Sequence, residues 1–178
     1  SEVEEVLKRA RELVERSTRE NRKILERARK MLEDARKTNE DVLRDVERLL
    51  DELRRELEKI KEDRLKEELK KKIDDILRKV EKLHREIKKR IDEVLEELAK
   101  LSKELKEDND RVLKEVEEAG VDKEVLDEIR ELVKENKKRS DDSLREAEKR
   151  LRELKEESDK TLDEIRRKLE KLKEEIDR

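Results

Sequence analysis

Apolar residues recur along the chain at positions that fall on one face of an α-helix. One series in the first third is spaced 18 residues apart, namely Val6, Ile24, Val42 and Ile60. Eighteen residues make five turns of 3.6 residues, so equivalent positions return to the same angle on a straight helix. The pattern therefore predicts long, nearly straight helices with one continuous apolar face, which a disordered chain has no reason to maintain.

Two interruptions divide this pattern into three helices. After Ile60 the apolar positions are displaced by two residues, which would turn the apolar face by about 200° on a continuous helix. A turn near residues 61–64 removes this conflict, and Asp63 is the expected N-cap of the second helix. Gly120, the only glycine, fits the left-handed position at a helix end, and Asp122 fits the next N-cap. The predicted helices are about 2–60, 64–118 and 123–177.

Three helices of similar length with short connections predict an all-α fold, an up-down-up antiparallel three-helix bundle. We expect residues 1–178 to form one domain. Lys and Arg number 53 against 56 Asp and Glu, with alternating signs, so neither nucleic acid nor an anionic membrane is an expected partner. No apolar run matches a signal peptide or a membrane span, which predicts a soluble chain made in the cytoplasm of an expression host.

Polar residues interrupt the apolar face in pairs one repeat apart. In an antiparallel hairpin, the residue numbers of two facing positions add up to a constant. For helices 1 and 2 this sum is 123 if their polar positions face each other. For helices 2 and 3 the sum of facing residue numbers is 242 on the same assumption. We therefore expect two buried polar layers, of which the first could extend to Ser17, Asn109 and Asn136, and the second to Thr38 or Thr161. The first layer contains Asn21, Ser102 and Ser140, and the second contains Asn39, His84 and Ser158.

These layers do not match a known catalytic or metal-binding pattern. His84 is the only histidine and cysteine is absent, so a transition-metal site would need carboxylates that the pattern places outside. A pair of Ser158 with His84 suggests a hydrolase, but backbone amides inside continuous helices cannot form an oxyanion hole. We expect no catalytic residue, no cofactor and no metal, and we expect His84 to be a buried, neutral imidazole with no carboxylate beside it.

The whole chain resembles de novo designed helical bundles that are built from straight helices with buried hydrogen-bond networks. The features that carry this resemblance are the 18-residue positions, the paired Asn, Ser and His layers, and a Glu, Lys and Arg surface. The cap at Ser1, the turn at Ala119 to Asp122 and the absence of Gln, Pro, Cys and aromatic residues add to it. The resemblance implies a protein without enzyme activity, in which the polar networks specify helix register.

Two functions remain open. The first is a designed structural scaffold with no natural biochemical role, and the alternative is a helical interaction module or a subunit of a designed oligomer. We expect a monomer that requires no partner, with a domain-swapped dimer or a helical homo-oligomer as alternatives. Nearly all apolar residues lie at the repeating positions, Ala99 being an exception, so a second apolar face is not evident from the sequence.

Overall fold

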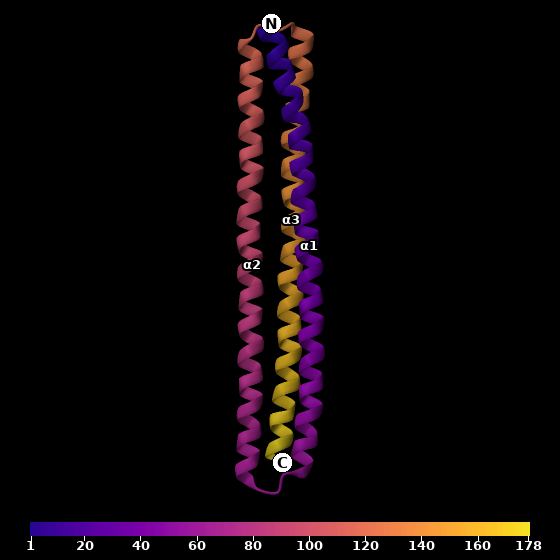
Figure 1. The fold of residues 1–178 in the computed structure, drawn as a ribbon, viewed down its shortest axis with the longest axis vertical. Coiled ribbons are helices and arrows are strands. Elements are labelled where there is room, and N and C mark those ends of the chain that lie inside the picture. Colours follow the sequence, from indigo (N-terminus) through magenta and orange to yellow (C-terminus); the bar gives the residue numbers. More distant parts are fainter. The chain divides into compact units, whose positions relative to one another are not determined.

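The computed structural model describes residues 1–178 and contains three long helices and no strands. Helix α1 spans Glu2–Lys59, α2 spans Asp63–Glu118 and α3 spans Lys123–Asp177. Figure 1 shows these helices and their two short connections, coloured along the sequence. The fold is an all-α helical bundle, as predicted. None of the three helices combines the length and the apolar character that crossing a membrane requires.

The start of α1 is capped by Ser1. Its hydroxyl oxygen accepts a hydrogen bond from the amide of Glu4 at 3.3 Å, and its carbonyl accepts one from the amide of Glu5 at 3.2 Å. The Glu4 carboxylate lies 3.6 Å from the Ser1 nitrogen. Amides of the first helical turn, which have no partner within the helix, are thereby bonded.

The connection between α1 and α2 differs slightly from the prediction. Helix α1 ends at Lys59, and α2 begins at Asp63 rather than at residue 64. The carbonyl of Glu62 accepts a hydrogen bond from the amide of Lys66 at 3.4 Å. Glu62 therefore holds the N-cap position that the sequence assigned to Asp63, and Asp63 is the first residue of the helix.

Gly120 has the only positive φ angle in the chain, 68°. The last turn before it closes through a hydrogen bond from the Ala119 amide to the Glu115 carbonyl at 3.1 Å. The carbonyl of Asp122 then accepts a hydrogen bond from the amide of Leu126 at 2.9 Å, which starts α3. The left-handed conformation at Gly120 is strained for residues with a Cβ atom, so this position favours glycine.

The contacts divide the chain into two compact units. Unit 1 comprises Ser1–Met31 and Glu93–Leu151, and unit 2 comprises Leu32–Asp92 and Arg152–Arg178. All three helices therefore contribute a segment to each unit. A single domain over residues 1–178 stays a prediction.

In unit 2, interhelical ion pairs define the direction and register of the helices. Except for His84–Asp159, the residue numbers of each α2/α3 ion pair add up to 247, so these segments are antiparallel; the pairs include Asp74–Lys173, Glu81–Arg166 and Lys88–Asp159. Partners on α1 and α3 are 121 residues apart, so these segments are parallel; examples are Arg36–Glu157 and Glu47–Lys168. The apolar core lies between the three segments and contains Val46, Leu50, Leu53, Leu69, Ile73, Val80, Leu162, Ile165, Leu169, Leu172 and Ile176.

In unit 1, the α1 and α2 segments are likewise antiparallel. The numbers of each ion pair between them add up to 124, one more than the predicted 123; the pairs are Arg9–Glu115, Arg16–Asp108 and Arg27–Glu97. Ion pairs between α2 and α3 again add up to 247, as in Asp110–Lys137 and Glu117–Arg130. One apolar cluster of this unit is smaller than the core of unit 2 and contains Val6, Ala10, Val116, Ile129 and Val133.

Candidate functional site

Unit 1 contains six polar side chains that point into its interior. All are neutral and all are buried, each being at most 5% exposed. We call this group the first polar cluster; it consists of Ser17, Asn21, Ser102, Asn109, Asn136 and Ser140. Buried polar groups are costly unless they are hydrogen bonded, so their partners determine what this cluster does.

Ser140 on α3 contacts both of the residues that the sequence assigned to its layer. Its hydroxyl donates a hydrogen bond to Oδ1 of Asn21 on α1 at 3.0 Å. Its carbonyl accepts a hydrogen bond from the hydroxyl of Ser102 on α2 at 3.4 Å. Nδ2 of Asn21, however, is buried and has no hydrogen-bond partner.

The remaining residues of this cluster are hydrogen bonded to Asn109, which lies on α2. Its Nδ2 donates to the Ser17 hydroxyl at 3.1 Å and to the carbonyl of Leu105 in its own helix at 2.7 Å. Its Oδ1 accepts a hydrogen bond from Nδ2 of Asn136 on α3 at 3.4 Å. Asn109 thus bonds to both neighbouring helices through one amide group.

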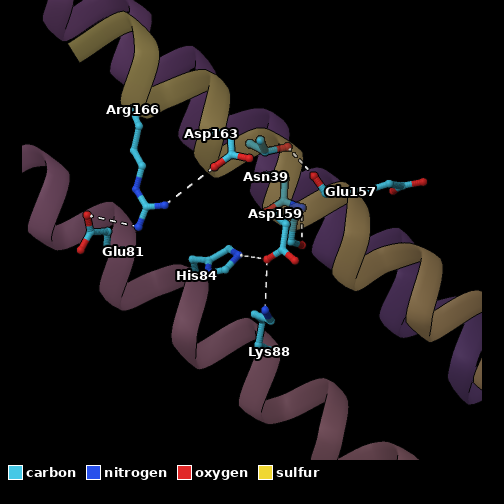
Figure 2. A network of polar contacts seen from close by, with 10 residues as sticks. Asn39, Glu81, His84, Lys88, Glu157, Asp159, Asp163 and Arg166 are labelled. Atoms are coloured by element: carbon cyan, nitrogen blue, oxygen red, sulfur yellow. Dashed lines mark hydrogen bonds and ion pairs between the residues drawn. The ribbon is translucent and has the colours of Figure 1, made fainter. Parts of the chain in front are cut away.

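The second polar cluster lies in unit 2 and has a different composition. Nδ2 of Asn39 on α1 donates to the hydroxyl of Ser158 on α3 at 3.0 Å. His84 and Lys88 on α2 both point toward Asp159 on α3, as Figure 2 shows. The His84 Nε2 atom lies 2.8 Å from Asp159 Oδ1, and Lys88 Nζ lies 3.1 Å from the same oxygen. We define the second polar cluster by these five residues.

The expectation that His84 has no carboxylate beside it is wrong, because Asp159 is hydrogen bonded to it. No hydrogen bond joins His84 to Asn39 or to Ser158, which bond to each other instead. Since an ionised carboxylate can only accept, Nε2 of His84 donates this hydrogen bond. A sequence signal that Asp159 faces α2 did exist: lysines at 70, 88 and 106 and aspartates at 141, 159 and 177 follow the same 18-residue spacing. Each lysine pairs with one of these aspartates.

Charged partners shift the ionisation of two carboxylates in unit 2. Burial alone would raise the pKa of Asp159, but the hydrogen bonds from Lys88 and His84 hold it below its usual value. The bidentate hydrogen bond from Arg36, at 2.7 and 2.9 Å, lowers the pKa of Glu157. Both groups are therefore carboxylates at neutral pH.

An open pocket of about 430 Å³ lies beside His84, and most of its charged groups are paired with one another. Arg166 lies 3.5 Å from Glu81 and 3.8 Å from Asp163, and Asp159 is bonded to His84. No group of three or more His, Cys, Asp or Glu residues is placed to hold a metal ion. Arg85 also lines the pocket, without an ion pair, and none of the lining residues is a serine, threonine, cysteine or lysine that could act as a nucleophile.

The two threonines considered for the second layer do not join it. The hydroxyl of Thr38 donates to the Asp34 carbonyl, and that of Thr161 donates to the Glu157 carbonyl, both at 3.0 Å. These are bonds within one helix to the residue four positions earlier. Neither threonine therefore links two helices.

The comparisons with known proteins found similarity to solved structures alone. No protein-family model matches the chain, and no curated protein matches it. A solved structure described as a "Computationally designed three helix bundle" is similar to 98% of this chain over 85% of its own length. The two are 22% identical, with a TM-score of 0.46. At that score the likeness adds nothing to the fold described above.

Proposed function

We propose that this chain is a structural scaffold of designed origin, without a catalytic role, in which the polar clusters specify the register of the helices. The observation that carries the proposal is the first polar cluster, where neutral side chains at core positions bond to other helices. Leucines can slide past one another at modest cost, whereas a one-turn shift would leave buried amides without partners.

The surface supports the same proposal. Lys, Arg, Asp and Glu make up 61% of the residues, and those beside the helix contacts pair across helices at constant register. Exposed ion pairs contribute little stability, but like-charged neighbours in a shifted register would disfavour that register. The second polar cluster adds Asn39, which bonds only to Ser158 in the observed register.

The test removes the polar cluster and measures register directly. We would replace Asn21, Asn109 and Asn136 with leucine and the three serines with alanine, and attach spin labels at exposed positions of α1 and α2 in unit 1. The expected result is a helical protein of equal or higher stability whose interhelical distances broaden or split into several populations. A single distance, as narrow as in the parent chain, would contradict the proposal.

A matched control replaces Thr18, Thr38 and Thr161 with alanine. Each of these hydroxyls bonds to a carbonyl of its own helix, so its removal leaves every interhelical hydrogen bond intact. The distance distributions of this control should stay narrow. Broadening in both variants would show that general loosening, rather than loss of the cluster, caused the effect.

A further inference from the structure

The two connections differ in what makes the chain turn. At the α2/α3 connection, Gly120 has a φ of 68°, a conformation that ends a helix and that is costly for other residues. The α1/α2 connection consists of Ile60, Lys61 and Glu62 and has no positive φ angle. Lysine and glutamate are good helix formers, and neither glycine nor proline occurs near this connection. The residue types here therefore do not explain why the chain leaves the helix.

The hydrogen bonds at the α1/α2 connection do not explain the turn either. They join backbone groups: the amide of Ile60 donates to the carbonyl of Leu57 at 3.1 Å. The amides of Leu65 and Lys66 donate to the carbonyl of Glu62 at 3.1 and 3.4 Å. A continuous helix would replace these bonds with its regular bonds between residues four apart. The turn must therefore be determined outside the connection.

The apolar faces on the two sides of this connection point in different directions. In unit 2, the buried apolar residues of α1 are Val46, Leu50 and Leu53, and those of α2 are Leu69, Ile73 and Val80. Counted at about 100° per residue, the centres of these two sets differ by about 200°. In the hairpin, both faces nevertheless meet in one core, because the connection between them is not helical. In a continuous helix the two faces would point to nearly opposite sides.

A continuous helix through residues 60–62 would be compatible only with a dimer. In such a dimer two continuous helices lie antiparallel, and α1 of each copy takes the place of α1 in the other copy. The twofold axis is perpendicular to both helices, so α3 of both copies lies on the same side of the pair. Each continuous helix must then turn both of its apolar faces toward that side. A difference of about 200° between the faces prevents this, because half of each helix would expose its apolar face to water.

We propose that the angle between the apolar faces of α1 and α2 keeps this hairpin closed and prevents the exchange of α1 between two copies of the chain. The residues of the connection are interchangeable in this respect. The contacts that carry the effect belong to the apolar core of unit 2 and not to the polar clusters. The inference is therefore independent of the register role proposed above, and either can fail without the other.

Insertions of different length test the proposal. Two alanines between Lys61 and Glu62 add about 200° and bring the two faces into line on a continuous helix. Four alanines add about 400°, which is about 40° beyond a full turn, and leave the faces about 160° apart. We expect the two-alanine variant to form a dimer with a dissociation constant at least about tenfold lower than that of the four-alanine variant.

Sedimentation equilibrium at up to about 1 mM protein measures this difference. The parent chain should keep its mass of 21.7 kDa, and the four-alanine variant should likewise stay monomeric. Equal dimerisation of the two variants would show that loop length, rather than the angle between the faces, is decisive. A two-alanine variant that stays monomeric would also overturn the proposal. Circular dichroism checks that both variants are folded.

Spin labels show whether the dimer arises by exchange of α1. The chain has no cysteine, so a label can be attached to a single cysteine in place of Arg9 in one batch and of Glu115 in another. These side chains on α1 and α2 lie 3.6 Å apart. When the two batches of the two-alanine variant are unfolded and refolded together, exchange places α1 of one copy against α2 of the other. A dimer without a short distance between the labels would contradict the proposal.

A variant of the connection itself provides the matched control. Replacing Ile60, Lys61 and Glu62 with alanine favours the helical conformation but leaves the angle between the faces unchanged. This variant should remain monomeric over the same range of concentration. Its dimerisation would show that the residues of the connection, rather than the direction of the apolar faces, keep the hairpin closed.

Discussion

Unit 1 and unit 2 place polar side chains among apolar ones in different ways. The six residues of the first polar cluster are all neutral and all buried. In the second polar cluster only Ser158 is buried, while the charged members Lys88 and Asp159 keep 39% and 49% of their side-chain surface exposed. Hydroxyls and amides can lose contact with water when they find partners, whereas ions retain part of their hydration because burial costs them far more.

The difference also changes how the helices are linked. Asn109 bonds to two other helices through uncharged groups, which are insensitive to salt and pH. Asp159 accepts hydrogen bonds from a histidine and a lysine of the same neighbouring helix, and these bonds depend on the ionisation of the three side chains. Unit 2 in turn has the larger continuous apolar core of the two clusters described. Unit 1 is thus expected to be sensitive to lost hydrogen bonds, and unit 2 to lost apolar contacts and to pH.

The largest expected effect comes from removing apolar contacts at equivalent positions. Ile165, 1% exposed in unit 2, lies two repeats after Ile129, which is 7% exposed and lines a cavity of about 70 Å³ in unit 1. Ile165→Ala should destabilise by about 4 kcal/mol and Ile129→Ala by about 2 kcal/mol, within the usual range for this change. Denaturant unfolding followed by circular dichroism measures both. A larger loss at Ile129 would reverse our ranking of the two cores.

The next effect compares two asparagines. Asn109→Ala leaves the amide of Asn136 buried without its partner and should cost about 1–3 kcal/mol. Asn39→Ala should cost less than about 1 kcal/mol, because Asn39 is half-buried and water can replace it at Ser158. Equal losses for the two variants would mean that burial does not distinguish the clusters.

Asn21 gives an effect of opposite sign. Its Nδ2 is buried without a partner, so Asn21→Leu should raise the free energy of unfolding by about 1 kcal/mol. Ser140 loses its acceptor in this variant, but a serine hydroxyl within a helix can bond to the carbonyl four residues earlier. Denaturation midpoints of Asn21→Leu and Asn39→Leu make the comparison, because Asn39 has a bonded Nδ2. A lower midpoint for Asn21→Leu would indicate that this amide does have a partner in solution.

The smallest effect is a pH dependence confined to unit 2. The pKa of Asp159 lies below its unfolded value of about 3.9, so its ionised form stabilises the fold above that pH. The contribution is lost as the pH falls through the lowered pKa, and it should stay below about 1 kcal/mol because water screens this half-exposed group. Asp159→Asn should therefore reduce the loss of stability between about pH 4 and about pH 2. Asp163→Asn is the control, since Asp163 lies 3.8 Å from an arginine of its own helix.

Much of the fold could be predicted from periodicity, because the positions of the apolar residues depend only on helical geometry. The break after Ile60 and the glycine at 120 marked both connections to within one or two residues. The N-cap was assigned to Asp63 because aspartate is a common cap, yet the backbone places Glu62 there. Boundaries of this kind depend on local backbone geometry that residue type indicates only weakly.

The candidate site was less accessible to sequence reasoning. Periodicity placed Asn21, Ser102 and Ser140 at one level, but it could not show which atoms bond or that one Asn21 hydrogen-bonding group stays unpaired. It also treated Asp159 as a surface residue. A side chain at the edge of an interface can turn inward or outward by changing its rotamer, and the helical pattern does not determine this choice.

The division of the chain has a consequence for the order of folding. Each unit contains one continuous hairpin, residues 32–92 or 93–151, and one segment that is distant in sequence. Within unit 1, Ser102 and Ser140 are 38 residues apart, whereas Asn21 and Ser140 are 119 apart. Short loops close at lower entropic cost, so we expect the hairpins to form first, with residues 1–31 and 152–178 joining afterwards. Pulse-labelling hydrogen exchange should then protect α2 before the N-terminal half of α1, and the reverse order would exclude this route.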